Sequence, residues 1–353
     1  YTLYLAISHT NLGLLLSETG DNQGADRSFH EAIHLQEELV AKSPDDAERH
    51  RNLAVTFNNL SAIYLASNPD KAQTCYESAL AHQKLAVASQ PRNTAFASDL
   101  AATYNNLGSL QSQREDFSAA ANSYDQAIQL HQKLLQADPS HKPYRHDLAI
   151  SFNNYGLMKS RLQDPSAAEQ AFQRSIAIQE ALVALHPDDM ALRSSFGGVY
   201  NNLGIAFEEQ RRLEDAAIAY RNAVEQQRVA YLRAPGVTRY RIFLSKHYFN
   251  FGRVLRQLGQ PDRAAQIAIQ RRELWPTDGE RLFSVAEELA ISCRDLQTSP
   301  GKQELTAARA SELTIETLQQ AIHAGFHLSP DVVDDEPFSA LRDDQRFLRL
   351  VKH

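Results

Sequence analysis

Asn105-Asn106-Leu107-Gly108 is the stretch that decides the fold, because variants of it recur along the chain. The six copies are Thr-Asn-Leu-Gly at 10–13, Asn-Asn-Leu-Ser at 58–61, Asn-Asn-Leu-Gly at 105–108, Asn-Asn-Tyr-Gly at 153–156, Asn-Asn-Leu-Gly at 201–204 and Phe-Asn-Phe-Gly at 249–252. Their second Asn advances by 47 or 48 residues each time. Self-similarity at a fixed period indicates an array of stacked structural repeats.

A second pattern repeats along the chain together with the Asn motif. It consists of a small residue followed twelve positions later by proline. These pairs are Ala32 and Pro44, Ala79 and Pro91, Ala127 and Pro139, Ser175 and Pro187, and Ala223 and Pro235. Proline lacks an N–H, and its ring clashes with the preceding helical turn, so each one closes a long second helix. The Gly or Ser that ends each Asn motif lets the first helix of a unit approach the second closely.

Turn residues separate the two helices of each unit. We expect these turns at 18–21, 68–70, 114–116, 163–165 and 213–215. Asp, Asn, Gly and Pro there supply turn geometry and a cap for the second helix. Apolar residues at spacings of three and four, such as Leu100, Tyr104 and Leu107, give each helix a face that neighbouring units must bury.

The third unit carries a specific family pattern. An aromatic residue, Leu-Gly, then Ala, an aromatic residue, Ala and a closing proline stand at Tyr104, Leu107, Gly108, Ala120, Tyr124, Ala127 and Pro139. This pattern resembles the tetratricopeptide repeat, whose unit is usually about 34 residues. Longer helices would absorb the difference, and elongated units are similar to those of bacterial Ser/Thr kinase fusions and kinesin light chains. The resemblance implies an all-α, right-handed solenoid of antiparallel helix pairs that binds other proteins.

The predicted organisation has two parts. Residues 1–275 form six elongated repeats, and residues 276–353 form a degenerate seventh repeat with a C-terminal helical cap. In the second part we expect helices at 279–296 and 303–325, joined by a loop at 299–301. Apolar residues after Gly325, among them Phe338, Leu341 and Phe347, are expected to cover the face that a last repeat would expose.

Composition restricts the class of partner. The net charge of −7 is spread over helices of mixed sign, so we expect no nucleic-acid partner. No run of eighteen apolar residues is present, so we expect no membrane partner. Cys75 and Cys293 are predicted to be reduced and buried, which favours a cytoplasmic location. Because the chain begins at Tyr1 inside a helical pattern, we expect it to be a piece of a longer protein.

The second Asn of each motif is the main candidate for ligand binding. We call Asn11, Asn59, Asn106, Asn154, Asn202 and Asn250 the asparagine row. The family resemblance implies that this position faces a concave groove, where amides would hydrogen-bond the backbone of an extended peptide. The alternative is that these amides bond to the neighbouring repeat and set the stacking angle. The same two alternatives apply to the first Asn of the pairs, at Asn58, Asn105, Asn153 and Asn201.

Residues beside the row predict the character of the groove. Four positions before and three after the row, the middle units carry Val55 and Ala62, Ala102 and Ser109, and Ile150 and Leu157. The sixth unit has Lys246 and Arg253 at these places, which predicts a basic patch for a terminal carboxylate or acidic side chain. A merely solvated basic face is the alternative.

Two further patterns involve histidine. His30-Glu31-Ala32-Ile33-His34 matches the H-E-x-x-H zinc motif, but Ala32 and Ile33 are consensus core residues and no third ligand follows. We therefore expect solvent-exposed histidines and no metal or other cofactor. A polar row of Gln36, Gln83, His131, Gln179 and Gln227 is predicted to space the stacked second helices.

The sequence thus predicts a non-catalytic scaffold that binds a peptide or partner protein. Two alternatives stay open. The chain could be the regulatory or substrate-recruiting arm of a larger enzyme such as a bacterial Ser/Thr kinase, or a self-associating architectural module. Oligomeric state does not follow from the sequence.

Overall fold

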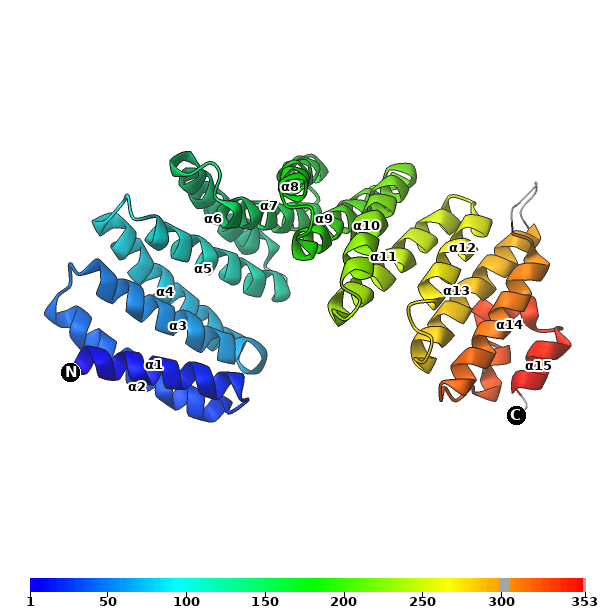
Figure 1. The fold of residues 1–353 in the computed structure, drawn as a ribbon, viewed down its shortest axis with the longest axis horizontal. Coiled ribbons are helices and arrows are strands. Elements are labelled where there is room, and N and C mark those ends of the chain that lie inside the picture. Colours follow the sequence, from blue (N-terminus) through cyan, green and yellow to red (C-terminus); the bar gives the residue numbers. More distant parts are fainter. Residues whose placement is uncertain (299–304, 352–353) are drawn as a thin grey trace. The chain divides into compact units, whose positions relative to one another are not determined.

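The computed structural model describes residues 1–298 and 305–351, and helices make up most of this part of the chain (Figure 1). No β-strand occurs among these residues. The α-helices are α1 (Thr2–Glu18), α2 (Asn22–Lys42), α3 (Ala47–Ser67), α4 (Pro69–Ser89), α5 (Thr94–Gln113), α6 (Phe117–Ala137), α7 (Lys142–Arg161), α8 (Pro165–Leu185), α9 (Met190–Glu209), α10 (Leu213–Arg233), α11 (Thr238–Gln257), α12 (Pro261–Arg272), α13 (Gly279–Thr298), α14 (Ala307–His323) and α15 (Gln345–Val351). Two 3₁₀ helices, η1 (Pro330–Val333) and η2 (Glu336–Leu341), precede α15.

Consecutive helices pack as antiparallel pairs in two compact units, residues 1–178 and 179–353. In the first unit α1 packs on α2, α3 on α4 and α5 on α6, while in the second α9 packs on α10, α11 on α12 and α13 on α14. The predicted all-α solenoid of antiparallel helix pairs is confirmed. The proposed boundary between repeats and cap at residue 275 stays a prediction.

Most of the tight turns within pairs contain one residue with a left-handed backbone, followed by the N-cap residue of the next helix; between α3 and α4 the turn is Asn68 alone, with φ of −153°. In the first unit Gly20, Glu115 and Gln163 have φ of 85°, 62° and 58°. The next residue caps the following helix, as when the Asp116 carboxylate accepts a hydrogen bond from the Ala119 backbone N–H at 3.1 Å. The capping role predicted for these turns is confirmed.

The turn predicted at 213–215 is wrong. Leu213 begins α10, so Glu214 and Asp215 lie in its first helical turn, and the real turn spans 210–212, with Arg211 at φ 62°. Glu-Asp resembles a turn in composition, but carboxylates are equally favoured in the first turn of a helix, where they face the positive end of its dipole.

Close contact between the two helices of a pair depends on the motif glycine at Gly13, Gly108, Gly156 and Gly204. A Cβ atom on Gly13 would lie 2.7 Å from the Phe29 ring, and one on Gly204 would lie 2.7 Å from the Tyr220 ring. The aromatic side chains are fully buried there. The predicted close approach is therefore confirmed, and the second helices end two residues before Pro44, Pro91, Pro139, Pro187 and Pro235.

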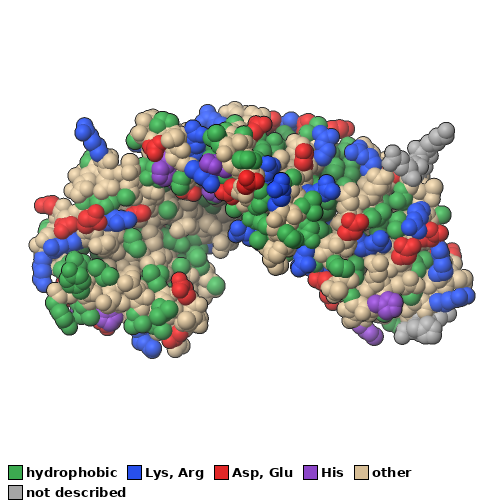
Figure 2. All heavy atoms as spheres, viewed as in Figure 1, with side chains coloured by type: hydrophobic (Ala, Val, Ile, Leu, Met, Phe, Trp, Pro, Cys, Tyr) green, Lys and Arg blue, Asp and Glu red, His purple; other side chains and the backbone are tan. Residues whose placement is uncertain are grey.

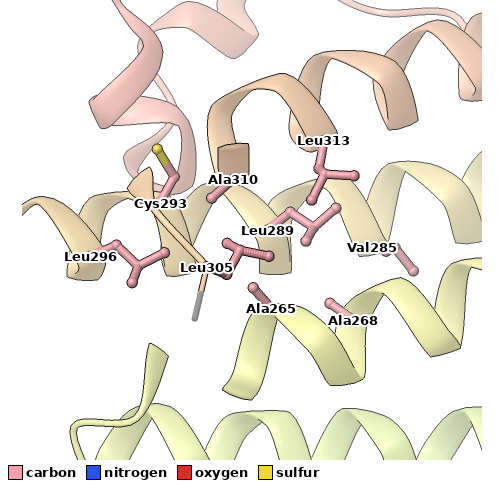
Figure 3. Close-up of a cluster of buried hydrophobic side chains, with 9 residues drawn as sticks. All are labelled: Ala265, Ala268, Val285, Leu289, Cys293, Leu296, Leu305, Ala310 and Leu313. Atoms are coloured by element: carbon pink, nitrogen blue, oxygen red, sulfur yellow. The ribbon is translucent and has the colours of Figure 1, made fainter. Parts of the chain in front are cut away.

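A separate apolar core holds the last helix pair. Figure 3 shows Val285 and Leu289 of α13 pointing toward Ala265 and Ala268 of α12, with Leu313 of α14 above them. The predicted loop 299–301, and residues 303–304 at the start of the predicted helix, lie outside the described residues. From Ala307 on, the predicted helix is present.

The opposite face of this pair is covered by the C-terminal segment. Phe338 and Leu341 of η2 and Phe347 of α15 are buried against Ala286 of α13 and Leu318 of α14. This packing forms the predicted helical cap, which keeps the apolar face of the last pair out of water.

The two cysteines are free and buried, as predicted. Burial raises the pKa of the Cys293 thiol to about 11, so it stays protonated at neutral pH. Among the described residues, no helix combines the length and the apolar character that a membrane crossing requires.

Candidate functional site: the asparagine row of the first helices

Consecutive first helices of the first unit are joined by one repeated hydrogen bond. Thr10 and Thr56 hydroxyls are 3.2 Å apart, and the Asn58 amide donates to the Thr103 hydroxyl at 2.7 Å. The Ser151 hydroxyl donates to the Asn105 Oδ1 at 3.0 Å. These bonds link α1 to α3, α3 to α5, and α5 to α7. The first Asn of the motif therefore holds neighbouring repeats in register.

In the second unit the first Asn of the motif is buried. Asn201 is 2% exposed, and its Oδ1 lies 3.1 Å from His247 Nδ1. The Asn250 amide also donates to this oxygen, at 2.8 Å, and Asn250 is 6% exposed. Asn201 and Asn250 thus belong to the packing between α9 and α11. Their burial leaves neither amide open to a ligand in this structure.

The other members of the asparagine row lie at the surface to different degrees. Asn11 and Asn106 are exposed, while Asn59, Asn154 and Asn202 are half-buried. Asn153 donates to the Asn154 Oδ1 at 3.1 Å, so this pair is linked within one helix. In the first unit, each row member directly follows the first residue of its motif. Asn11, Asn59, Asn106 and Asn154 therefore hold equivalent places on adjacent first helices.

Small and apolar residues flank this part of the row. Ala62, Ala102 and Ser109 are exposed, and Val55, Ile150 and Leu157 are half-buried. Sequence reasoning missed Ile7 and Leu14, which hold the same two places around Asn11 and are 41% and 39% exposed. The spacing that identified Val55 and Ala62 would have found them. The α1 end of the row is the most apolar.

The predicted basic patch of the second unit is partly neutralised. Arg253 donates to the Glu208 carboxylate at 2.8 Å, and the Tyr220 hydroxyl donates to the same oxygen at 2.8 Å. Burial and the adjacent Glu208 carboxylate raise the pKa of Tyr220. Lys246 is exposed on α11. Of the two predicted cations, Arg253 is therefore committed to a cross-helix ion pair.

His30 and His34 of the H-E-x-x-H motif are both exposed, at 58% and 70% of their side chains. The rings pair with different carboxylates, His30 with Asp26 at 3.7 Å and His34 with Glu38 at 3.6 Å. Over residues 1–298 and 305–351, no group of three or more His, Cys, Asp or Glu side chains is placed to hold a metal ion. The motif thus lies on a solvated helix face.

Two members of the polar row of the second helices, Gln179 and Gln227, form hydrogen bonds to first helices. Gln227 accepts from the Ser194 hydroxyl at 3.0 Å and donates to the Tyr240 carbonyl at 3.1 Å. Gln179 donates to the Ser195 hydroxyl at 2.9 Å. At Gln179 and Gln227 the predicted spacer role between second helices is therefore wrong, and for the other three members it stays a prediction.

His131 occupies this place in the third repeat, and its ring is 1% exposed with neither nitrogen hydrogen-bonded. Burial lowers its pKa, an effect that the nearby Asp147 carboxylate partly opposes. Protonation of His131 therefore favours the unfolded chain. Its contribution to the free energy of unfolding does not change above the unfolded-state pKa of about 6.5, and the protein loses stability as the pH falls from there toward the folded-state pKa.

Replacing His131 by Gln, the residue at four equivalent positions, is expected to reduce this acid sensitivity. The gain is about 1.4 kcal/mol for each pH unit between 6.5 and the lowered folded-state pKa. Urea unfolding at pH 7.5 and pH 5 checks it. The two proteins should differ little at pH 7.5, and an equal loss of stability on acidification in both would contradict the assignment. Burial also lowers the pKa of His82 and His247, which leave a residual pH dependence in both proteins.

Comparison with known proteins agrees with the repeat structure. Family models described as tetratricopeptide repeat match residues 6–46, 101–134 and 119–181. Among curated proteins, none matches this chain. The chain therefore carries tetratricopeptide repeats in these residues.

Two solved structures share the fold. BtubC (BKLC) from P. vanneervenii is 17% identical, with a TM-score of 0.54 over 72% of this chain and 90% of that one. The S. pombe nuclear import adaptor Nro1 is 12% identical, with a TM-score of 0.51 over 96% of this chain and 99% of that one. At these identities the likeness concerns the fold alone. Folds of this kind are generally non-catalytic scaffolds for protein partners.

Proposed function

We propose that the chain is a non-catalytic interaction module whose first unit binds an extended peptide segment along the asparagine row. The observation that carries the proposal is the repeated, accessible amide at Asn11, Asn59, Asn106 and Asn154 on adjacent first helices. An amide donates and accepts hydrogen bonds, so each can pair with a peptide N–H or C=O whatever the peptide's side chains.

The packing bonds support this assignment. Asn58 and Asn105 already bond to the next repeat at 2.7 and 3.0 Å, so the register of the row is fixed before a ligand arrives. Preorganisation of this kind reduces the entropy lost on binding. Ile7 and Leu14 favour a ligand whose apolar residues lie against α1. The small side chains of Ala102 and Ser109 allow the peptide backbone to lie close to α5.

Selection of peptides from a display library on the intact chain, followed by affinity measurement, tests the proposal. Replacing Asn59, Asn106 and Asn154 together by Ala is expected to weaken the selected peptide at least about tenfold, because each hydrogen bond contributes about 0.5–1.5 kcal/mol. The matched control replaces three exposed amides of α6, Asn122, Gln132 and Gln136, by Ala. Equal affinity for all three proteins would refute the row as the binding site.

The proposed setting is a reducing compartment such as the cytoplasm, in keeping with unbridged Cys75 and Cys293. Proposed partners are proteins, with no nucleic acid or membrane among them. Within the described residues nothing favours the alternative of a kinase arm, which stays a prediction.

A further inference from the structure

A recess at one end of the second unit is not part of the proposed peptide site. It encloses about 500 Å³, which is in the size range of small-molecule sites. The start of α11, the loop before α13 and the turn after α14 line it, at Arg241, 275–280 and 324–326. All of these residues belong to the second unit, so binding in the recess is independent of the asparagine row of the first unit.

The walls of this recess are fixed by packing. Trp275 is 5% exposed, and its indole N–H donates to the Ser245 hydroxyl at 3.0 Å. A Cβ atom on Gly279 would lie 2.9 Å from the Ala321 carbonyl oxygen and 2.9 Å from the Phe326 Cβ. The start of α13 therefore lies directly against the segment that follows α14. Because the recess is preformed, the protein loses little conformational freedom when a ligand binds.

Arg241 presents an unpaired cation to the recess. Figure 2 shows Lys and Arg side chains interspersed with Asp and Glu over the second unit, where ion pairs such as that of Arg253 with Glu208 form. No ion pair joins Arg241 to a carboxylate in the described part of the chain. Its guanidinium carbon lies 4.5 Å from the centroid of the Trp275 ring, and its Nε is buried without a hydrogen-bond partner. The side chain is thus anchored in the wall, and the ring fixes the plane of a donor fork that suits a carboxylate.

The charges beside Arg241 determine which ligand fits. The Asp278 carboxylate accepts from the Arg281 backbone N–H at 3.1 Å and pairs with the Arg281 side chain, also at 3.1 Å. Asp278 and Arg281 therefore neutralise each other. Glu280 is exposed at the edge of the recess and has no ion pair within residues 1–298 and 305–351. The recess thus offers one unpaired cation and one unpaired anion.

We propose that this recess binds a free α-amino acid with a large apolar side chain. The carboxylate of the ligand binds the Arg241 guanidinium, and its ammonium group lies beside Glu280. The side chain of the ligand packs on Pro276 and on the half-buried Phe326, whose ring is held by stacking on Phe283 with the centroids 4.4 Å apart. A zwitterion suits both unpaired charges, whereas a simple anion would be repelled by Glu280 and a simple cation by Arg241.

Isothermal titration calorimetry of the 353-residue chain with L-phenylalanine tests the proposal. Saturable binding is expected, and it should change the fluorescence of Trp275, the sole tryptophan. Arg241→Gln should weaken binding at least about tenfold, because it removes a charge-assisted pair. Arg239→Gln is the matched control, since Arg239 also lies on α11 over an aromatic ring, that of Tyr240 at 5.3 Å, but does not line the recess.

Analogues of the ligand test each charge on the unaltered chain, so this part of the test does not depend on the folding of a variant. Hydrocinnamate lacks the ammonium group and phenethylamine lacks the carboxylate, and each should bind at least about tenfold more weakly than L-phenylalanine. Glycine, which lacks the apolar side chain, should also bind more weakly. No binding of L-phenylalanine or L-leucine at millimolar concentration would overturn the proposal. Equal affinity of Arg241→Gln and the unaltered chain, or of hydrocinnamate and L-phenylalanine, would overturn it as well.

Discussion

Replacing Phe338 by Ala is expected to lower the free energy of unfolding of the second unit by about 3–5 kcal/mol. The Phe338 ring is fully buried, and its centroid lies 5.9 Å from that of Phe283 on α13 and 5.6 Å from that of Phe347 on α15. It therefore joins the cap to the helix pair beneath it. Truncation leaves a cavity that helices on both sides already constrain.

Loss of this contact should also release the cap. Ala286, Ile315 and Leu318 would then face water, and an uncovered end of a helix array promotes aggregation. Urea unfolding followed by the fluorescence of Trp275, the sole tryptophan and a residue of the second unit, measures the stability change. Light scattering measures aggregation.

Leu350→Ala provides the comparison for Phe338. Leu350 packs at the margin of the same cluster and is only half-buried, so its truncation should cost less than half as much. If Phe338→Ala unfolded at the same urea concentration as the unaltered chain, the C-terminal segment would not stabilise the last pair.

Local rules explain why much of the fold could be predicted. Proline ends a helix through its own ring, and Asp116 caps the helix that follows it, so both signals act within a few residues. Because the motif recurs, each signal is found several times along the chain. A signal that fits two structures gave a wrong prediction: Glu214 and Asp215 indicated a turn, although they lie in the first helical turn of α10.

Whether an individual Asn side chain is buried or exposed could not be predicted in this way. Asn201 and Asn105 hold the same place in identical tetrads, yet Asn201 is buried and Asn105 is half-buried. The difference depends on His247, which reaches Asn201 from a helix 46 residues further on. Likewise, Arg253 was predicted as a free cation because its partner Glu208 lies 45 residues away. Such contacts are set by how helices pack, and one repeat viewed alone does not contain them.

Gly204→Ala and Gly252→Ala are expected to change stability in opposite directions although they are the same substitution at equivalent positions. A methyl group on Gly204 would lie 2.7 Å from two carbons of the Tyr220 ring and 3.0 Å from a third. Tyr220 is fully buried and its hydroxyl is bonded to Glu208, so the ring has no free direction in which to move. Overpacking of this kind costs about 1–3 kcal/mol, and the rigid ring favours the upper end.

At Gly252 the aromatic residue of the pattern is replaced by Ala268, and the nearest atom to a new Cβ would be 3.7 Å away. That distance is ordinary van der Waals contact. Alanine in a helix interior is favoured over glycine by about 1 kcal/mol, so Gly252→Ala should stabilise the second unit. Urea unfolding of both variants, again followed by Trp275, should give midpoints on either side of that of the unaltered chain. If both midpoints shifted in the same direction, the effect of the substitution would depend on the backbone conformation of glycine and not on the ring packed against it.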